Sequence, residues 1–65
     1  MLTEIGEAAG QVWQCLSENG EMTPSAVAKK TGLKRDILFA GMGWLARESK
    51  LEFRRGKRSV YAYLP

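Results

Sequence analysis

The segment that most constrains the fold lies near the C-terminal end of the sequence, where four cations surround a single glycine. The glycine is Gly56, and the cations are Arg54, Arg55, Lys57 and Arg58. Short runs of strand-forming residues lie on both sides of this cluster. Because glycine tolerates the positive φ that a tight reversal requires, the pattern predicts a β-hairpin with a basic tip over residues 51–64.

The two predicted strands cover residues 51–54 and 59–64. Alternate side chains of a strand share a face, which separates the second strand into two sets. One set is Val60, Ala62 and Leu64, and the other is Tyr61 and Tyr63. We expect one face to close the core, and the tyrosines either to pack across the hairpin or to lie at an interface.

The first of three predicted helices covers about residues 3–19 and is amphipathic. Thr3 is the expected N-terminal cap, and Asn19-Gly20 is a typical left-handed stop. Apolar residues recur at helical spacing on one face, at Ile5, Ala9, Val12 and Leu16. This helix is therefore expected to pack on the rest of the chain through one side.

The second predicted helix covers about residues 24–31 and has the clearest start signal in the chain. Thr23 is a capping residue, and Pro24 suits the first helical position because its missing N–H would be unpaired anyway. Gly32 then permits a sharp turn, and Leu33 is expected to fill the angle between the helices.

The third predicted helix, about residues 34–49, is apolar on nearly every side. The residues expected on its inner face are Ile37, Leu38, Gly41, Trp44 and Leu45. The residues expected to point outward are Phe39, Met42, Gly43 and Ala46. A helix that is apolar nearly all round is normally covered on more than one side. The outward set is therefore a predicted interface with a second copy or another protein.

Small residues form a second notable pattern. Gly6, Gly10 and Ser17 make a ridge beside Trp13 in the first helix. Glycine is costly inside a helix, so the ridge indicates either close approach by another backbone or simple tolerance, and both interpretations stay open. Gly41 and Gly43 would likewise permit close approach to the third helix.

The length of 65 residues predicts one domain, which buries only about 60% of its unfolded surface. The single cysteine excludes an internal disulfide, so support from a second copy, a homodimer, is expected. The uncharged runs are too short for a membrane span. Glu4 stands where a signal peptide would carry cations, and we therefore expect a soluble, cytoplasmic protein.

The net charge of +3 conceals a strong asymmetry along the chain. Residues 1–28 contain four glutamates and no Lys or Arg, a net charge of −4. Residues 29–65 contain all ten cations against three acids, a net charge of +7. A one-sided basic field attracts polyanions, which favours a polyanionic partner over cations that serve solubility alone.

Thr23-Pro24, Ala28, Gly32-Leu33 and the Arg55-Gly56-Lys57 tip follow one another in an order that resembles a winged helix-turn-helix domain. The chain is similar to short stand-alone winged-helix proteins of bacteria and archaea. The resemblance implies a mainly α fold with a small β-hairpin (α+β), a three-helix winged helix-turn-helix in a single domain over residues 1–65.

The resemblance also implies DNA binding, in the role of a small transcriptional regulator. In such domains the second helix of the turn motif enters the major groove and the wing touches the backbone. By position, Asp36 and Phe39 would face the groove. The cations implied as DNA-binding are Lys29, Lys30, Lys34, Arg35, Arg54, Arg55, Lys57 and Arg58.

Two departures from the family pattern limit base readout. Lys34 stands where a Ser or Thr cap usually opens the recognition helix. The outer face of that helix has no Asn, Gln or Ser, and Phe39, Met42 and Ala46 cannot hydrogen-bond base edges. Contacts to the DNA backbone are therefore expected.

Two other interpretations remain beside DNA binding. The outer face of the third helix would make the protein an interaction or dimerisation module without DNA binding, and the basic tip would then only protect an edge strand. An enzyme is not expected, because the chain has no histidine and Cys15 lies at the edge of an apolar face. We expect no catalytic residue, cofactor, metal or small-molecule ligand.

Overall fold

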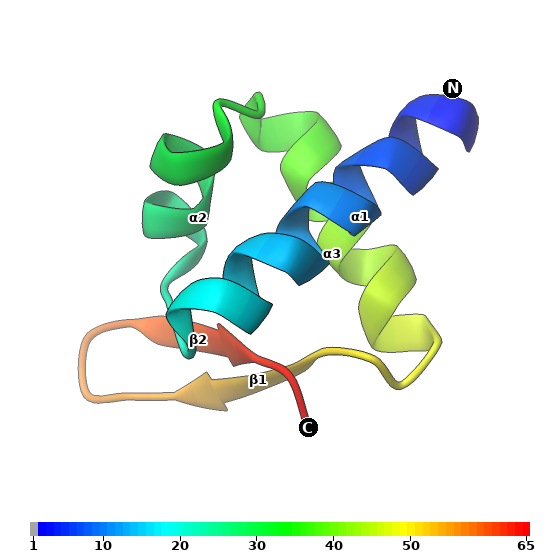
Figure 1. Ribbon diagram of the computed structural model, residues 1–65. Helices are drawn as coiled ribbons and strands as arrows, with labels where there is room; N and C mark the ends of the chain where they lie inside the picture. The colour runs from blue at the N-terminus through cyan, green and yellow to red at the C-terminus, as the bar shows by residue number, and fades with distance from the viewer. Residues whose placement is uncertain (1) are drawn as a thin grey trace.

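A computed structural model describes residues 2–65 as three helices followed by an antiparallel hairpin. The elements are α1 (Leu2–Asn19), α2 (Pro24–Thr31), α3 (Arg35–Arg47), β1 (Glu52–Arg55) and β2 (Val60–Tyr63). The helices pack as a small bundle in which α1 crosses α3, and the hairpin lies against one end of this helical body (Figure 1). The expected α+β architecture is confirmed.

The first helix starts earlier than its sequence signal. α1 begins at Leu2, so Thr3 lies inside the helix and the prediction that Thr3 caps it is wrong. The other end follows the prediction: Gly20 has φ +80°, and its N–H donates to the carbonyl of Leu16 at 2.8 Å. A left-handed glycine thus ends α1, as the Asn19-Gly20 pair indicates.

The second helix, α2, spans the range that the sequence predicts. The Thr23 hydroxyl accepts a hydrogen bond from the Ala26 N–H at 3.2 Å, and Pro24 occupies the first turn. Gly32 has φ +75° and donates its N–H to the carbonyl of Ala28 at 2.8 Å. These two caps define the turn between α2 and α3.

The third helix is shorter at both ends than the predicted 34–49. Lys34 is the N-terminal flanking residue and makes no side-chain cap. At the other end Ser49 adopts φ +60°, and the N–H of Lys50 donates to the carbonyl of Leu45 at 2.8 Å. A residue in the left-handed region with this return bond closes a helix, which is why α3 ends at Arg47.

The inner face of α3 differs from the prediction at two positions. Met42 is 0% exposed, so the prediction that it points outward is wrong. It follows Leu38 by about one helical turn and therefore lies on the same, buried side. Trp44, predicted to face inward, is 45% exposed. Ala46 is partly buried against the core, whereas Phe39 and Gly43 are exposed as expected.

Close approach of backbones occurs at Gly41. A Cβ atom there would lie 2.9 Å from the Ala9 nitrogen and 3.1 Å from the Ala8 carbonyl carbon, so α1 and α3 cross at this point. The other helical glycines behave differently. Apart from chain neighbours and the helix's own backbone, no atom of residues 2–65 lies within 4 Å of a Cβ added at Gly6, Gly10 or Gly43. Among the described residues, Gly6 and Gly10 of the ridge on α1 thus pack against no other element.

The hairpin pairs β1 with β2 in a register that runs from Glu52 opposite Tyr63 to Arg55 opposite Val60. Met22 extends the sheet: its N–H and carbonyl exchange hydrogen bonds with Ala62 at 3.0 and 2.7 Å. Ala62 is fully buried, so this contact anchors β2 to the helical body. No helix within residues 2–65 is long and apolar enough to cross a membrane.

Gly56 is needed at the tip for a different reason than expected. The positive-φ glycines of the described chain are Gly20 and Gly32, so the prediction of positive φ at Gly56 is wrong. Its N–H donates to the carbonyl of Ser59 at 2.7 Å. A Cβ atom at Gly56 would lie 2.9 Å from the Tyr61 ring. Close approach, not a left-handed turn, favours glycine here.

Candidate nucleic-acid interface

The predicted DNA-binding cations are exposed and fall into two groups. The turn cations, on the last turn of α2 and the start of α3, are Lys29, Lys30, Lys34 and Arg35. The tip cations, at the end of the hairpin, are Arg55, Lys57 and Arg58. The α2–α3 turn and the hairpin tip lie at opposite ends of α2 (Figure 1). The two groups therefore lie near different ends of α2.

Of the eight predicted cations, Arg54 is the one that forms an ion pair within residues 2–65. Its Nε and Nη2 donate to the two carboxylate oxygens of Glu21 at 2.9 and 2.8 Å. The guanidinium carbon also lies 4.8 Å from the centre of the Tyr61 ring. Arg54 therefore crosses the outer face of the sheet and ties β1 to the α1–α2 connection. We call the Arg54–Glu21 pair the strap.

The strap changes the electrostatics of its members. Hydrogen bonding from Arg54 lowers the pKa of Glu21 below its ordinary value. On the same face Tyr63 donates to Glu52 at 3.1 Å, and this hydrogen bond raises the pKa of Tyr63. Both tyrosines thus pack across the hairpin, one of the two expected roles. Glu21 was not singled out from the sequence, because its partner lies 33 residues further along the chain.

The exposed side of α3 carries four residues spaced by four positions. They are Arg35, Phe39, Gly43 and Arg47, which we call the α3 stripe. The Arg35 guanidinium lies 5.6 Å from the centre of the Phe39 ring. Arg47 makes a loose pair with Glu48 at 3.7 Å and stays largely solvated. Arg47 was not among the predicted site residues, although its i+4 spacing from Gly43 places it on this side.

Asp36, expected to face a groove, has a local role at the start of α3. Its carboxylate accepts a hydrogen bond from the Ile37 N–H at 2.7 Å. It thereby binds a free N–H of the first turn, which Lys34 leaves without a side-chain cap. A carboxylate here also suits the positive end of the helix dipole.

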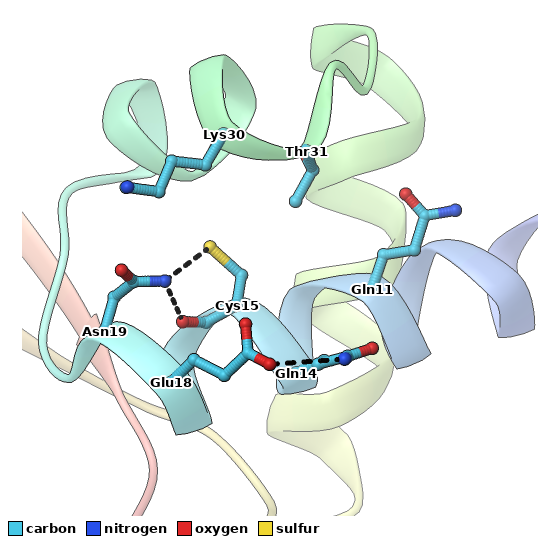
Figure 2. Close-up of a pocket in the computed structure, with 7 residues that line it drawn as sticks. All are labelled: Gln11, Gln14, Cys15, Glu18, Asn19, Lys30 and Thr31. Carbon is cyan, nitrogen blue, oxygen red and sulfur yellow. Dashed lines mark hydrogen bonds between the residues drawn. The ribbon is translucent and has the colours of Figure 1, made fainter.

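An open hollow of about 420 Å³ lies between α1 and α2. Figure 2 shows the residues that line it: Gln11, Gln14, Cys15, Glu18, Asn19, Lys30 and Thr31. Cys15 is buried at its floor, where Asn19 Nδ2 lies 3.9 Å from its sulfur and Met22 Sδ lies 3.7 Å away. Among residues 2–65 no three His, Cys, Asp or Glu side chains gather in a metal-binding cluster. Cys15 packs as a small hydrophobe here.

Three helices, a capped turn and a hairpin anchored to the α1–α2 connection together define the architecture, and a family model agrees with it. The model, described as a winged helix-turn-helix domain (DUF2582), matches residues 1–64. The chain belongs to this winged-helix family. The expected resemblance to winged helix-turn-helix domains and the expected fold are thus confirmed over residues 1–64.

Two relatives extend the comparison with this winged helix. The uncharacterized protein MJ1608 of Methanocaldococcus jannaschii is 41% identical over 54 residues, which is 78% of this chain and 76% of that protein. The solution NMR structure of protein BT2368 from Bacteroides thetaiotaomicron superimposes with a TM-score of 0.87 at 31% identity. That match covers 95% of this chain and 76% of the Bacteroides chain.

A third neighbour is the Zalpha domain of PKZ from Carassius auratus, solved in complex with Z-DNA. It superimposes with a TM-score of 0.77 over 92% of this chain and 97% of its own, at 18% identity. At this identity the likeness shows a shared winged-helix fold.

Proposed function

We propose that this winged helix binds nucleic acid, in the first instance DNA, mainly through the phosphate backbone. The carrying observation is the exposure of seven cations in the turn and tip groups. Within residues 2–65 the Lys and Arg ion pairs involve Arg47 and Arg54 and none of these seven. Their charge is therefore available to a polyanion.

The chemistry of α3 supports backbone contacts more than base readout. Phe39 and Gly43 offer no side-chain hydrogen bond to a base edge, and Asp36 already holds a backbone N–H. The Zalpha neighbour bound to Z-DNA supports nucleic acid as the class of partner. In this proposal the protein is a small cytoplasmic transcriptional regulator that acts by binding rather than catalysis.

Arg54 has a positioning role in this proposal. The strap holds β1 against the α1–α2 connection, which fixes the direction in which the tip projects. Arg55, Lys57 and Arg58 then make the phosphate contacts of the wing. The turn cations contact phosphates near the start of α3.

Fluorescence anisotropy with a labelled duplex tests the proposal. Seven phosphate contacts would weaken binding by about 10⁴-fold between about 50 and 200 mM salt. The triple variant Arg55→Ala/Lys57→Ala/Arg58→Ala should bind more weakly, and its log–log salt slope should fall by about 2–3 units.

A matched control separates local contacts from overall charge. Thr3→Glu/Gly10→Glu/Ser17→Glu changes the net charge equally, but on exposed positions of α1 that do not line the hollow beside Lys30. We expect it to keep most of the salt slope. The wing's role would be contradicted if the tip variant bound DNA as strongly as the parent. Equal weakening by the tip variant and the control would contradict it too.

Self-association is a second candidate, favoured by large apolar side chains left in solvent. Trp13 is 46% exposed beside Gly6 and Gly10, where the backbone is open. The α3 interface predicted from Phe39, Met42, Gly43 and Ala46 loses its centre because Met42 is buried. Sedimentation velocity at high concentration tests the homodimer, and a strict monomer would remove it.

A further inference from the structure

The α3 stripe combines two cations, one aromatic ring and one bare stretch of backbone. Its members follow one another at four-residue steps, so each lies about 6 Å from the next and the ends are about 18 Å apart. Read from the start of α3, the order is a cation (Arg35), a ring (Phe39), an open position (Gly43) and a cation (Arg47). This order places one flat apolar surface between two positive charges.

Phe39 is available as a stacking platform. Its side chain is 44% exposed, although it lies in the first half of a helix whose opposite side is fully buried. The Arg35 guanidinium lies over the ring, 5.6 Å from its centre, which places a cation on one face of the platform. The ring is therefore held next to a positive charge without being covered by the core.

Gly43 leaves room for a planar group next to that ring. Within residues 2–65, no heavy atom beyond its chain neighbours and its own helix backbone lies within 4 Å of a Cβ built at this position, in contrast to Gly41 two residues earlier. Gly43 follows Phe39 by about one turn and so lies on the same side of α3. A planar group stacked on Phe39 can thus extend over bare helix backbone.

The ligand that fits a ring between two cations is a base between two phosphates. Bases in a duplex are stacked on one another and do not offer their faces, whereas a single strand offers every face. Aromatic side chains in basic surfaces bind single strands in this manner, with little dependence on sequence. Arg35 and Arg47 complement the negative phosphates on both sides.

We propose that the α3 stripe binds single-stranded nucleic acid, with one base stacked on Phe39 over Gly43 and the flanking phosphates held by Arg35 and Arg47. The proposal rests on the proposed function in one respect, the class of partner. It goes further by naming the strandedness and the contact. The apolar face of α3, unsuited to reading base edges, is suited to binding base faces.

Three labelled probes of equal length test this assignment by anisotropy: a twelve-nucleotide oligothymidylate, an abasic twelve-mer with the same phosphates, and a twelve-base-pair duplex. We expect the oligothymidylate to bind about 10-fold more tightly than the abasic strand, since stacking contributes that much per base. It should also bind more tightly than the duplex. Equal affinity for the abasic strand, or a preference for the duplex, overturns the proposal.

Two variants locate the base contact. Phe39→Ala should remove the preference for bases over the abasic strand and leave binding of the abasic strand nearly unchanged. Gly43→Leu should block the base by bulk, because the space around a Cβ at this position is open. Gly10→Leu is the matched control: its position is equally open but lies on α1. If the Gly43→Leu variant binds oligothymidylate as strongly as the Gly10→Leu variant, the proposal is overturned.

The outcomes separate this inference from the proposed function. All three probes could bind in a salt-sensitive manner, more weakly to the tip variant and without preference for bases. That result would support phosphate binding and contradict the stacked base. Binding of none of the probes at low salt removes both. Thermal unfolding of each variant shows whether its fold is intact before any affinity is compared.

Discussion

The helical body and the hairpin of this protein are held by different kinds of contact. In the body, Leu38, Met42 and Val12 are almost completely buried, and the backbones of α1 and α3 meet at Gly41. On the outer face of the hairpin, exposed polar side chains make the contacts, through the strap and the Tyr63–Glu52 hydrogen bond. Packing thus fixes α3, whereas surface charge helps to fix the wing.

The difference matters because both regions belong to the candidate interface. Buried apolar contacts depend little on salt, whereas an exposed ion pair weakens as salt screens it. The position of α3 should therefore hold across solution conditions. The wing should respond to pH, to salt and to the phosphates of a polyanionic partner.

Loss of the Met42 side chain should produce the largest effect on the body. Met42→Ala removes a fully buried side chain and should lower the free energy of unfolding by about 2–5 kcal/mol. Urea denaturation measures it. Phe39→Ala, on the exposed side of the same helix, is the control and should cost within about 0.5 kcal/mol. Equal losses would mean that α3 is rotated from the orientation described.

Gly41→Ala should have the next largest effect. The new methyl group would lie 2.9 Å from the Ala9 nitrogen, so α1 and α3 must separate. Overpacking of this kind costs about 1–3 kcal/mol, and the better helix propensity of alanine returns up to about 1 kcal/mol. We expect a net loss of about 1–2 kcal/mol by denaturation. A variant as stable as the parent would show that the crossing is looser than described.

Gly43→Ala should change stability in the opposite direction. Its methyl group meets nothing within 4 Å, so the change in helix propensity acts alone. We expect a gain of about 0.5–1 kcal/mol in the free energy of unfolding. The same measurement on Gly41→Ala gives the contrast. A loss at Gly43 would indicate a contact with a second copy at this surface.

Local signals in the sequence are sufficient for the elements and most of their ends. Thr23-Pro24 and Gly32 delimit α2 because a cap and a left-handed residue act within a few positions. The end of α3 was predicted too late, because Ser49 adopts a left-handed conformation that its residue type seldom takes.

The side of a helix that faces the core, and the side chains that pair across the fold, depend on tertiary structure and are harder to predict. Phe39 and Met42 are both apolar residues of the same helix, yet Met42 is buried because it lies on the side of α3 that packs into the core with α1. The exposure of the predicted cations could be inferred from the sequence, because charged side chains favour solvent. The ion pair between Arg54 and Glu21 could not, since it joins residues far apart in the chain.

The strap should give the smallest effect on stability, and the one most dependent on pH. Glu21→Gln removes the carboxylate that Arg54 binds, and should lower stability slightly at neutral pH. The pKa of Glu21 is lowered in the folded protein by its hydrogen bonds from Arg54. The stabilisation is therefore complete above the ordinary Glu pKa of about 4.3, and is lost as pH falls through the lowered folded value.

Denaturation of parent and variant at a series of pH values measures this contribution. The difference between them should be constant near neutrality and should shrink from about pH 5 downward, as Glu21 takes up a proton. Glu7→Gln removes an equal charge from the exposed side of α1 and serves as the control. A difference that persists unchanged in strong acid would mean that shape, not charge, holds Glu21 and Arg54 together. The contrast between a body held by packing and a wing held partly by surface charge would then fail at its weakest contact.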